Sequence, residues 1–299
     1  MPADLGRHHP FDLCFGVFSD GITGTSRCRI RPFWGINLLR RTTMHKPVSR
    51  PSRRGLISPA LLSTLFSLLL GASAALPAAA MTPEQIIAAL QRPENSTGNI
   101  ADAVEEATGA RGWMSSDVKP IYDARIVGRA ATALMRPVLK TDNRKYQSHF
   151  LDILDEAAPG SVLVYVMQDG LEIAAMGNLM GTTAKVRGLA GAVIDGAVRD
   201  ITELRRLQFP VWSRRVSPAT SVGRMISVDK QIPVKCGEIM VHPGDYIVAD
   251  ADGVVVVPTA AALQVVELLK KYDDKESQMI PIIEREKSMR KALEKYNRY

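Results

Sequence analysis

The chain is poor in the residues that hold transition metals and disulfides. Its 299 residues include three cysteines and five histidines. Beyond residue 80 only Cys236, His149 and His242 remain, and they are far apart in sequence. A single cysteine cannot close an internal disulfide, and isolated histidines exclude the clustered ligand spacing of zinc or iron sites. We therefore interpret Cys236 as a small buried apolar residue.

Two common catalytic motifs are also missing. The sequence has no G-x-S-x-G nucleophile elbow and no G-x-x-x-x-G-K-[S/T] phosphate loop. The stretch DADG at 250–253 is not followed by the twelve-position calcium loop with its terminal glutamate, so it predicts a turn. An enzyme built on this sequence would depend on carboxylates, arginine, backbone amides and a hard cation such as Mg²⁺ or Mn²⁺.

The excess of basic residues is confined to the start of the chain. The net charge is +7, and residues 1–80 hold ten Lys and Arg against three Asp and Glu. Residues 81–299 hold 28 of each kind. This neutral part lacks the overall basicity of most nucleic-acid-binding domains, although a local basic patch stays open. We therefore expect no nucleic acid as a partner.

Residues 44–80 have the layout of an export signal. A basic stretch that ends at Arg54 precedes fifteen largely apolar residues and then three alanines that offer an A-x-A cleavage site. The motif SRRGLI also resembles a twin-arginine signal. We expect residues 1–80 to be a leader, the protein to be periplasmic, and no stable membrane association after cleavage. The alternative is a cytoplasmic protein that starts at Met81.

The rest of the sequence predicts one mixed α/β domain over residues 81–299. No repeat, low-complexity run or long Pro/Gly linker divides it. Thr82, Pro83 and Gln85 form a helix-start signal. We predict strands at 128–137, 162–167, 192–194, 210–213 and 253–258. We predict helices at 97–109, from 149 up to a Pro-Gly turn at 159–160, at about 178–188, at about 200–207, and from 259 onward with Leu263, Val266 and Leu269 on one stripe. This alternation favours the α/β class.

The stretch VIDGAVRDITE, residues 193–203, carries the first candidate site. Asp195-Gly196 predicts a turn after the apolar run, and Arg199, Asp200 and Glu203 then lie at the start of a helix. Arg199 offers a two-pronged donor for a carboxylate or an enolate. Asp200 can ligate a cation, and Glu203 would share its helical face and hold a water. The alternative explanation is a surface ion pair.

A second candidate lies in MGNLMGTTAKVRG, residues 176–188. Here Gly177 and Asn178 lead from a strand into a helix, whose first N–H groups and dipole favour an anion. The alternative explanation is a glycine that only makes a turn. Together the two stretches would provide an anion site, an arginine and a metal-binding carboxylate.

These stretches resemble the class II 4-hydroxy-4-methyl-2-oxoglutarate aldolases and the RraA-like proteins. The segments TGNIADAVE, GRAATALM, APGSVLVY and HPGDYIVADADGVVVVP also stand in that family's order, so the resemblance covers about residues 95–260. It implies a β-rich domain of the swivelling β/β/α type with flanking helices and a C-terminal helical segment. It also implies a homotrimer or hexamer with sites between subunits.

The resemblance also implies site residues. Asp200 would hold Mg²⁺ or Mn²⁺ with several waters, Arg199 would bind the pyruvate moiety, and Glu203 would complete the R-D-x-x-E pattern. Backbone amides around four residues would bind the substrate carboxylate: Gly177, Asn178, Leu179 and Met180. A glutamate of the adjacent subunit also serves in the family, and Glu276 is the candidate. Family members usually carry an acidic residue where this chain has Asn178, and an amide brings neither charge nor base.

The activity implied is cleavage of 4-hydroxy-2-oxo acids between C3 and C4, which leaves a pyruvate enolate. Decarboxylation of oxaloacetate gives the same enolate, so oxaloacetate decarboxylase activity is also expected. The alternative is a regulator that binds a ribonuclease without catalysis, as some relatives do. Retention of Glu203 favours the enzyme, because the ribonuclease binders tend to break the catalytic pattern.

Overall fold

The computed structural model describes residues 81–138 and 148–296. The leader predicted over residues 1–80 lies outside these ranges. Within them, no helix combines the length and hydropathy that a membrane span requires.

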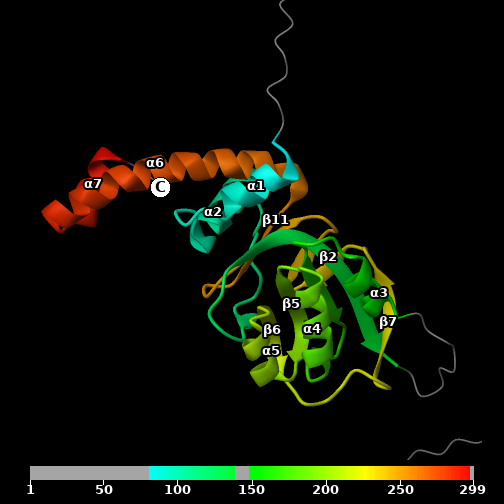
Figure 1. Ribbon diagram of the computed structural model, residues 1–299. Helices are drawn as coiled ribbons and strands as arrows, with labels where there is room; N and C mark the ends of the chain where they lie inside the picture. The colour runs from blue at the N-terminus through cyan, green and yellow to red at the C-terminus, as the bar shows by residue number, and fades with distance from the viewer. Residues whose placement is uncertain (1–80, 139–147, 297–299) are drawn as a thin grey trace, which may run out of the picture. The chain divides into compact units, whose positions relative to one another are not determined.

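A curled, mixed β-sheet forms the centre of this part of the chain (Figure 1). Its strands are β1 (Lys119–Pro120), β2 (Ile126–Pro137), β3 (Val162–Met167), β4 (Ala174–Met176), β5 (Gly191–Val198), β6 (Val211–Val216), β7 (Met225–Lys230), β10 (Tyr246–Ala249) and β11 (Val254–Val257). The main order is β1-β6-β5-β3-β2-β10-β11, with β4 on β5 and β7 on β2. Strands β8 (Val234–Cys236) and β9 (Ile239–Val241) form a separate antiparallel pair.

The helices divide between two groups. They are α1 (Pro83–Leu90), α2 (Thr97–Thr108), α3 (His149–Glu156), α4 (Asn178–Val186), α5 (Ile201–Leu207), α6 (Ala262–Glu286) and α7 (Met289–Lys295), with the 3-10 turn η2 (Thr259–Ala261). Helices α1, α2 and α6 share an apolar cluster with β10 and β11, whereas α3, α4 and α5 pack on β3 and β5. Figure 1 shows the first group apart from the second.

Both faces of the central sheet are buried, as β3 illustrates. Its odd-numbered residues, Leu163, Tyr165 and Met167, pack in the cluster under α3, α4 and α5. Its even-numbered valines belong to the cluster that contains Trp212 and β8. A strand covered on both faces reads as one continuous apolar run because alternate side chains enter different cores. The fold class predicted from the sequence, a β-rich α/β domain with flanking helices and a C-terminal helical segment, is confirmed.

Several local predictions are also confirmed. The Thr82 hydroxyl accepts from the Gln85 N–H, and the Gln85 side chain accepts from the Thr82 N–H, which is the reciprocal cap expected at this helix start. The apolar run 162–167 coincides with β3. Cys236 is fully buried, and burial raises the pKa of its thiol.

The turn predicted at Asp195-Gly196 is wrong, because β5 continues through it to Val198. The register shifts between Ile194 and Ala197, so the pair forms a bulge rather than a turn. A Cβ on Gly196 would lie 2.5 Å from the Met167 side chain, so a larger residue does not fit. Asp195 is tolerated inside the strand because its carboxylate has partners from other segments.

The single helix predicted from residue 259 onward is also divided. Residues 259–261 form η2, α6 ends at Glu286, and Lys287 adopts a left-handed backbone with φ of 49°. Ser288 then caps α7 by accepting from the Lys291 N–H. Of the predicted apolar stripe, Val266 and Leu269 are buried whereas Leu263 is 41% exposed.

Arg214 pairs with the carboxylate inside β5. Its Nη1 donates to Asp195 Oδ1 over 2.9 Å, and its Nε donates to Asp117 Oδ2 over 2.8 Å. The Gly237 N–H donates to the second oxygen of Asp195 over 2.8 Å. Burial acts to raise the pKa of Asp117, but hydrogen bonds from Arg214 and Ser115 outweigh it and hold that pKa below its usual value. The network therefore favours the ionised form of the Asp117 carboxylate beside the guanidinium.

We expect Arg214→Met to lower the free energy of unfolding by about 3 kcal/mol, because Asp195 is left as a buried and unpaired charge. Urea denaturation measures this change. The matched control is Arg215→Met, since Arg215 is exposed and lies 3.9 Å and 4.0 Å from its two acidic neighbours. That variant should stay within about 0.5 kcal/mol of the parent. Equal stability of the two variants would contradict this role of Arg214.

Candidate functional site

The two candidate stretches meet at one edge of the sheet. Strands β4 and β5 are parallel neighbours, with Met176 opposite Val198. Each strand leads directly into a helix, β4 into α4 and β5 into α5, and these two helices pack against each other (Figure 1). The carboxyl ends of parallel strands are where α/β sheets place their ligands. The topology therefore joins segments that the sequence only suggested separately.

Asp200 is hydrogen-bonded to the start of α4. The Asn178 N–H donates to Asp200 Oδ2 over 2.9 Å, although the two residues are 22 positions apart. Asp200 has a left-handed backbone, with φ of 56° and ψ of 42°. The Arg199 N–H donates to the Met176 carbonyl over 3.0 Å, which ties the end of β5 to the end of β4. The Arg199 Nε lies 3.6 Å from Asp200 Oδ2.

Gly177 makes this close approach possible. A Cβ on Gly177 would lie 2.5 Å from Asp200 Oδ2 and 2.9 Å from Arg199 Nε. Its backbone is extended, with φ of −142°, so any residue could adopt its conformation. Glycine is needed here for space, because a side chain would occupy the position of the Asp200 carboxylate.

The remaining predicted residues lie around this centre. Leu179 is 81% exposed, and Met180 is partly buried against the core under α4. Glu203 is the third residue of α5, and no hydrogen bond or ion pair joins its side chain to another residue of the ranges described. Helix α5 begins at Ile201, one residue later than predicted. Asp200 is therefore the N-cap residue of α5 and does not belong to its first turn, and the role expected of Glu203 beside it stays a prediction.

Glu276 lies on α6, where its carboxylate accepts a hydrogen bond from the Asn99 side chain of α2 over 3.2 Å. Its predicted role concerns a neighbouring subunit and stays a prediction. The side chains of Arg199 and Asp200 are 41% and 37% exposed, so the centre is open to solvent.

The donor atoms present fit a hard cation. Across residues 81–138 and 148–296 no group of three His, Cys, Asp or Glu side chains lies together. Asp200 provides a carboxylate at this centre: its Oδ2 accepts from the Asn178 N–H, and no hydrogen bond joins its Oδ1 to another described residue. Magnesium commonly binds through one or two carboxylates and keeps several waters. The set suits Mg²⁺ or Mn²⁺ better than metals that need thiolate or imidazole ligands.

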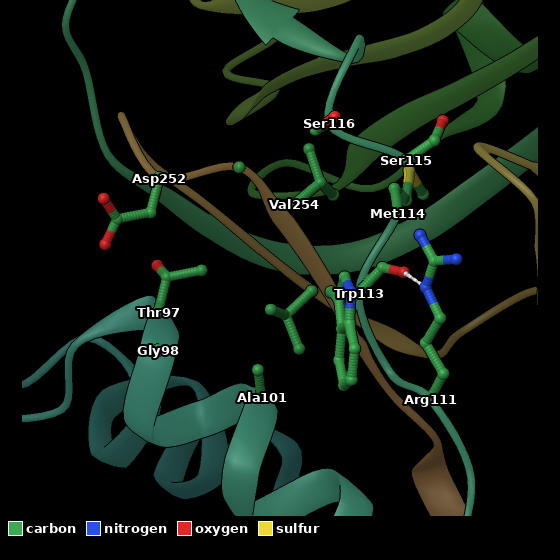
Figure 2. A pocket seen from close by; sticks show the side chains of 12 residues that line it. Thr97, Gly98, Ala101, Arg111, Trp113, Met114, Ser115, Ser116, Asp252 and Val254 are labelled. Atoms are coloured by element: carbon green, nitrogen blue, oxygen red, sulfur yellow. Dashed lines mark hydrogen bonds between the residues drawn. The ribbon is translucent and has the colours of Figure 1, made fainter.

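A separate cavity of about 370 Å³ lies between the start of α2 and β11 (Figure 2). The Arg111 Nε donates to the Trp113 carbonyl over 2.8 Å, and the guanidinium lies 5.5 Å from the centre of the indole ring. None of the residues that line this cavity was predicted from the sequence to be a site residue. Another cavity, of about 470 Å³, is lined in part by Asp195, Arg214 and Lys235. Segments far apart in the sequence form the walls of both cavities, so no local sequence pattern predicts either cavity.

The sequence model of the RraA-like family, described as Aldolase/RraA, matches residues 97–256. A protein of Halalkalibacterium halodurans, provisionally named a 4-hydroxy-4-methyl-2-oxoglutarate aldolase, is 34% identical over 198 residues, or 66% of this chain and 89% of that protein. A protein of Burkholderia multivorans with the same provisional name is 31% identical over 55% of this chain and 97% of its own length.

Solved structures agree with these sequence matches. An uncharacterised protein of Pseudomonas syringae pv. tomato superposes with a TM-score of 0.64 at 25% identity, over 73% of this chain and 96% of that one. Streptomyces coelicolor RraAS2, described as an unusual member of the RNase ES inhibitor RraA family, has a TM-score of 0.58 at 26% identity, over 66% and 96%. The resemblance found in the sequence is thereby confirmed.

Proposed function

The chain belongs to the RraA-like family, and we propose that it is a lyase that cleaves 4-hydroxy-2-oxo acids, of the 4-hydroxy-4-methyl-2-oxoglutarate type, to pyruvate. One observation carries the proposal: the Arg199 guanidinium, the Asp200 carboxylate and the amide end of α4 converge at one sheet edge. These groups are what a negatively charged 2-oxo acid and its enolate need. The provisional names of two relatives support the same reaction class.

Asp200 would hold the divalent cation, Mg²⁺ or Mn²⁺, that the family resemblance implies. When bound, such a cation supplies Lewis-acid stabilisation of the charge that develops on the 2-oxo group. The carboxylate of Asp200 contributes a fixed negative charge whose position is set by the Asn178 N–H. Glu203, on the first turn of α5, would hold a water near this carboxylate.

Arg199 would stabilise the enolate by donating to its oxygen. As the C3–C4 bond breaks, the C4 hydroxyl gives its proton to water, C4 becomes a carbonyl carbon, and the electron pair passes to the pyruvate fragment as its enolate. A charged donor at the growing oxyanion lowers the barrier to this step. The substrate carboxylate would bind the first amides of α4, which lack helical partners. Asp200 already uses the Asn178 N–H, so those of Leu179 and Met180 are left for the substrate. Loss of CO₂ from oxaloacetate yields the same enolate, so the site would catalyse that reaction too.

We infer that neighbouring copies complete the site in a homotrimer or hexamer. Leu179 and Val186, seven positions apart on α4, are 81% and 82% exposed. Leu179 lies beside the site at the start of α4 and Val186 at the other end of the helix. Large apolar side chains exposed together are typical of surfaces that another protein covers. Glu276 of an adjacent copy is the proposed additional carboxylate.

Replacing Arg199 tests the proposed reaction. We expect Arg199→Ala to lower kcat for oxaloacetate decarboxylation about a hundredfold or more, the scale of losing one oxyanion donor. The loss should fall on kcat more than on KM, because the charge grows in the transition state. Pyruvate release with Mg²⁺ measures it. Arg206→Ala, which changes an exposed arginine of the adjacent helix α5, is the control. Parental kcat in folded Arg199→Ala protein would remove Arg199 from the mechanism.

Replacing Asp200 tests the cation site. Asp200→Asn keeps an oxygen that can accept from the Asn178 N–H but removes the charge. We expect the fold to stay intact and the affinity for Mg²⁺, measured by calorimetry, to fall by at least about tenfold. Asp252→Asn, an exposed aspartate on the turn before β11, is the control. If the two variants bind Mg²⁺ equally, the cation lies elsewhere.

A second candidate function is regulation of a ribonuclease without catalysis. The observation that favours it is the likeness to Streptomyces coelicolor RraAS2, whose description places it among inhibitors of a ribonuclease. Dose-dependent inhibition of an RNase E-type enzyme, equal for the parent and Arg199→Ala, together with no pyruvate release, would support this function in place of the lyase.

We also propose that the protein is exported as a single domain over residues 81–299. Cell fractionation and intact-mass measurement of native protein test this. We expect a periplasmic protein whose mass lacks residues 45–80, and cytoplasmic precursor when Arg53 and Arg54 are both changed to Lys, because the twin-arginine motif is lost. A cytoplasmic protein that begins at Met81 would contradict export.

A further inference from the structure

Helices α4 and α5 start in an unusual way. Gly177 is the N-cap residue of α4 and has no side chain with which to cap it. Asp200 is the N-cap residue of α5, yet its side chain makes no cap bond to α5. Its Oδ2 accepts instead from the Asn178 N–H, the first amide of α4. The carboxylate at the start of one helix therefore caps the other, where the helix dipole favours a negative charge.

Main-chain hydrogen bonds also hold the backbone at Asp200, both before and after this residue. Before it, the Arg199 N–H donates to the Met176 carbonyl over 3.0 Å. After it, the Asp200 carbonyl accepts from the Leu204 N–H over 3.0 Å. With the main chain fixed, the remaining freedom lies in the side-chain torsions, and the bond from Asn178 restricts them. One oxygen is thus bound to α4, while no hydrogen bond joins Oδ1 to another described residue.

The side chain of Asn178 is not the group that donates to the Asp200 carboxylate. Its Oδ1 accepts from the Thr182 hydroxyl over 3.5 Å, one turn further along α4. Only the main-chain N–H of Asn178 reaches Asp200. The side chain at position 178 could thus differ from the family's usual acid while the contact to Asp200 persists.

We propose that the backbone N–H of Asn178 is a positioning group, which orients the Asp200 carboxylate for cation binding. The proposal rests on the proposed function, because it assigns Asp200 to the cation. Groups that orient a metal ligand commonly change metal affinity by about 10- to 100-fold when they are lost. Gly177 belongs to the same arrangement, since it leaves the space that Asp200 Oδ2 occupies.

Proline at position 178 tests the amide directly. Asn178 is the first residue of α4, the position where helices accept proline because its missing N–H has no helical partner. Asn178→Ala removes the carboxamide but keeps the N–H, so the ratio of dissociation constants for the two variants reports the amide alone. We expect Mn²⁺ to bind about tenfold more weakly to Asn178→Pro than to Asn178→Ala, as measured by calorimetry.

Met289→Pro is the matched control, because Met289 is the exposed first residue of α7 and lies outside the site. It should bind Mn²⁺ as the parent does. Gly177→Ala provides a second route if Asn178→Pro does not fold, because its methyl group would displace Asp200 Oδ2 and leave the N–H intact. We expect it to weaken Mn²⁺ binding by a similar factor.

A metal-free measurement separates this proposal from the proposed function. In Asp200→Ala the Asn178 amide loses its acceptor, so its hydrogen exchange, followed by NMR, should be faster than in the parent. Unchanged exchange would overturn the contact itself. Equal Mn²⁺ affinity of the Pro and Ala variants, or parental affinity of Gly177→Ala, would overturn the positioning role. Parental affinity of Asp200→Asn would instead overturn the cation assignment of the proposed function.

Discussion

Complete burial of β5 is the constraint on which the rest of this structure depends. Every residue from Gly191 to Val198 is buried, between two apolar cores. A polar group in such a strand must find partners, and Asp195 finds them in Arg214 and the Gly237 N–H. The strand is thereby fixed in register against β3, β4 and β6, so the point at which it leaves the sheet is fixed as well. Arg199 and Asp200 begin at that point.

An Asp–Arg pair has different consequences inside β5 and just after its end. The side chains of Asp195 and Arg214 are 11% and 16% exposed and lie 2.9 Å apart, so breaking this pair leaves a buried charge at a cost of several kcal/mol. Arg199 and Asp200 are 41% and 37% exposed and 3.6 Å apart, and a pair of this kind contributes about 1 kcal/mol or less. Breaking the first pair therefore costs the fold stability, whereas the second pair can exchange its contacts for those of a ligand at little cost.

The start of α4 links the sheet to the proposed chemistry. Parallel pairing of β4 with β5 brings two helix starts side by side, and Gly177 lets them approach until the carboxylate at the start of α5 caps α4. The result is a charged centre held by main-chain groups on rigid elements. Its openness to solvent, with Leu179 exposed beside it, is consistent with the proposal that a second copy of the chain covers it.

The sequence by itself determined the features that depend on neighbouring residues. The reciprocal cap of Thr82 and Gln85, the apolar run of β3 and the helix start at Asn178 were all readable, because their deciding contacts lie within a few positions. The family resemblance, carried by ordered motifs, added the fold class. Tertiary structure decided whether Asp195-Gly196 turned the chain or bulged within β5, because the partner of Asp195 lies 19 positions away. It also joined Asn178 to Asp200 across 22 positions. A local pattern specifies torsions and hydrogen bonds nearby, but which distant donor meets a buried or clustered carboxylate depends on strand pairing and packing.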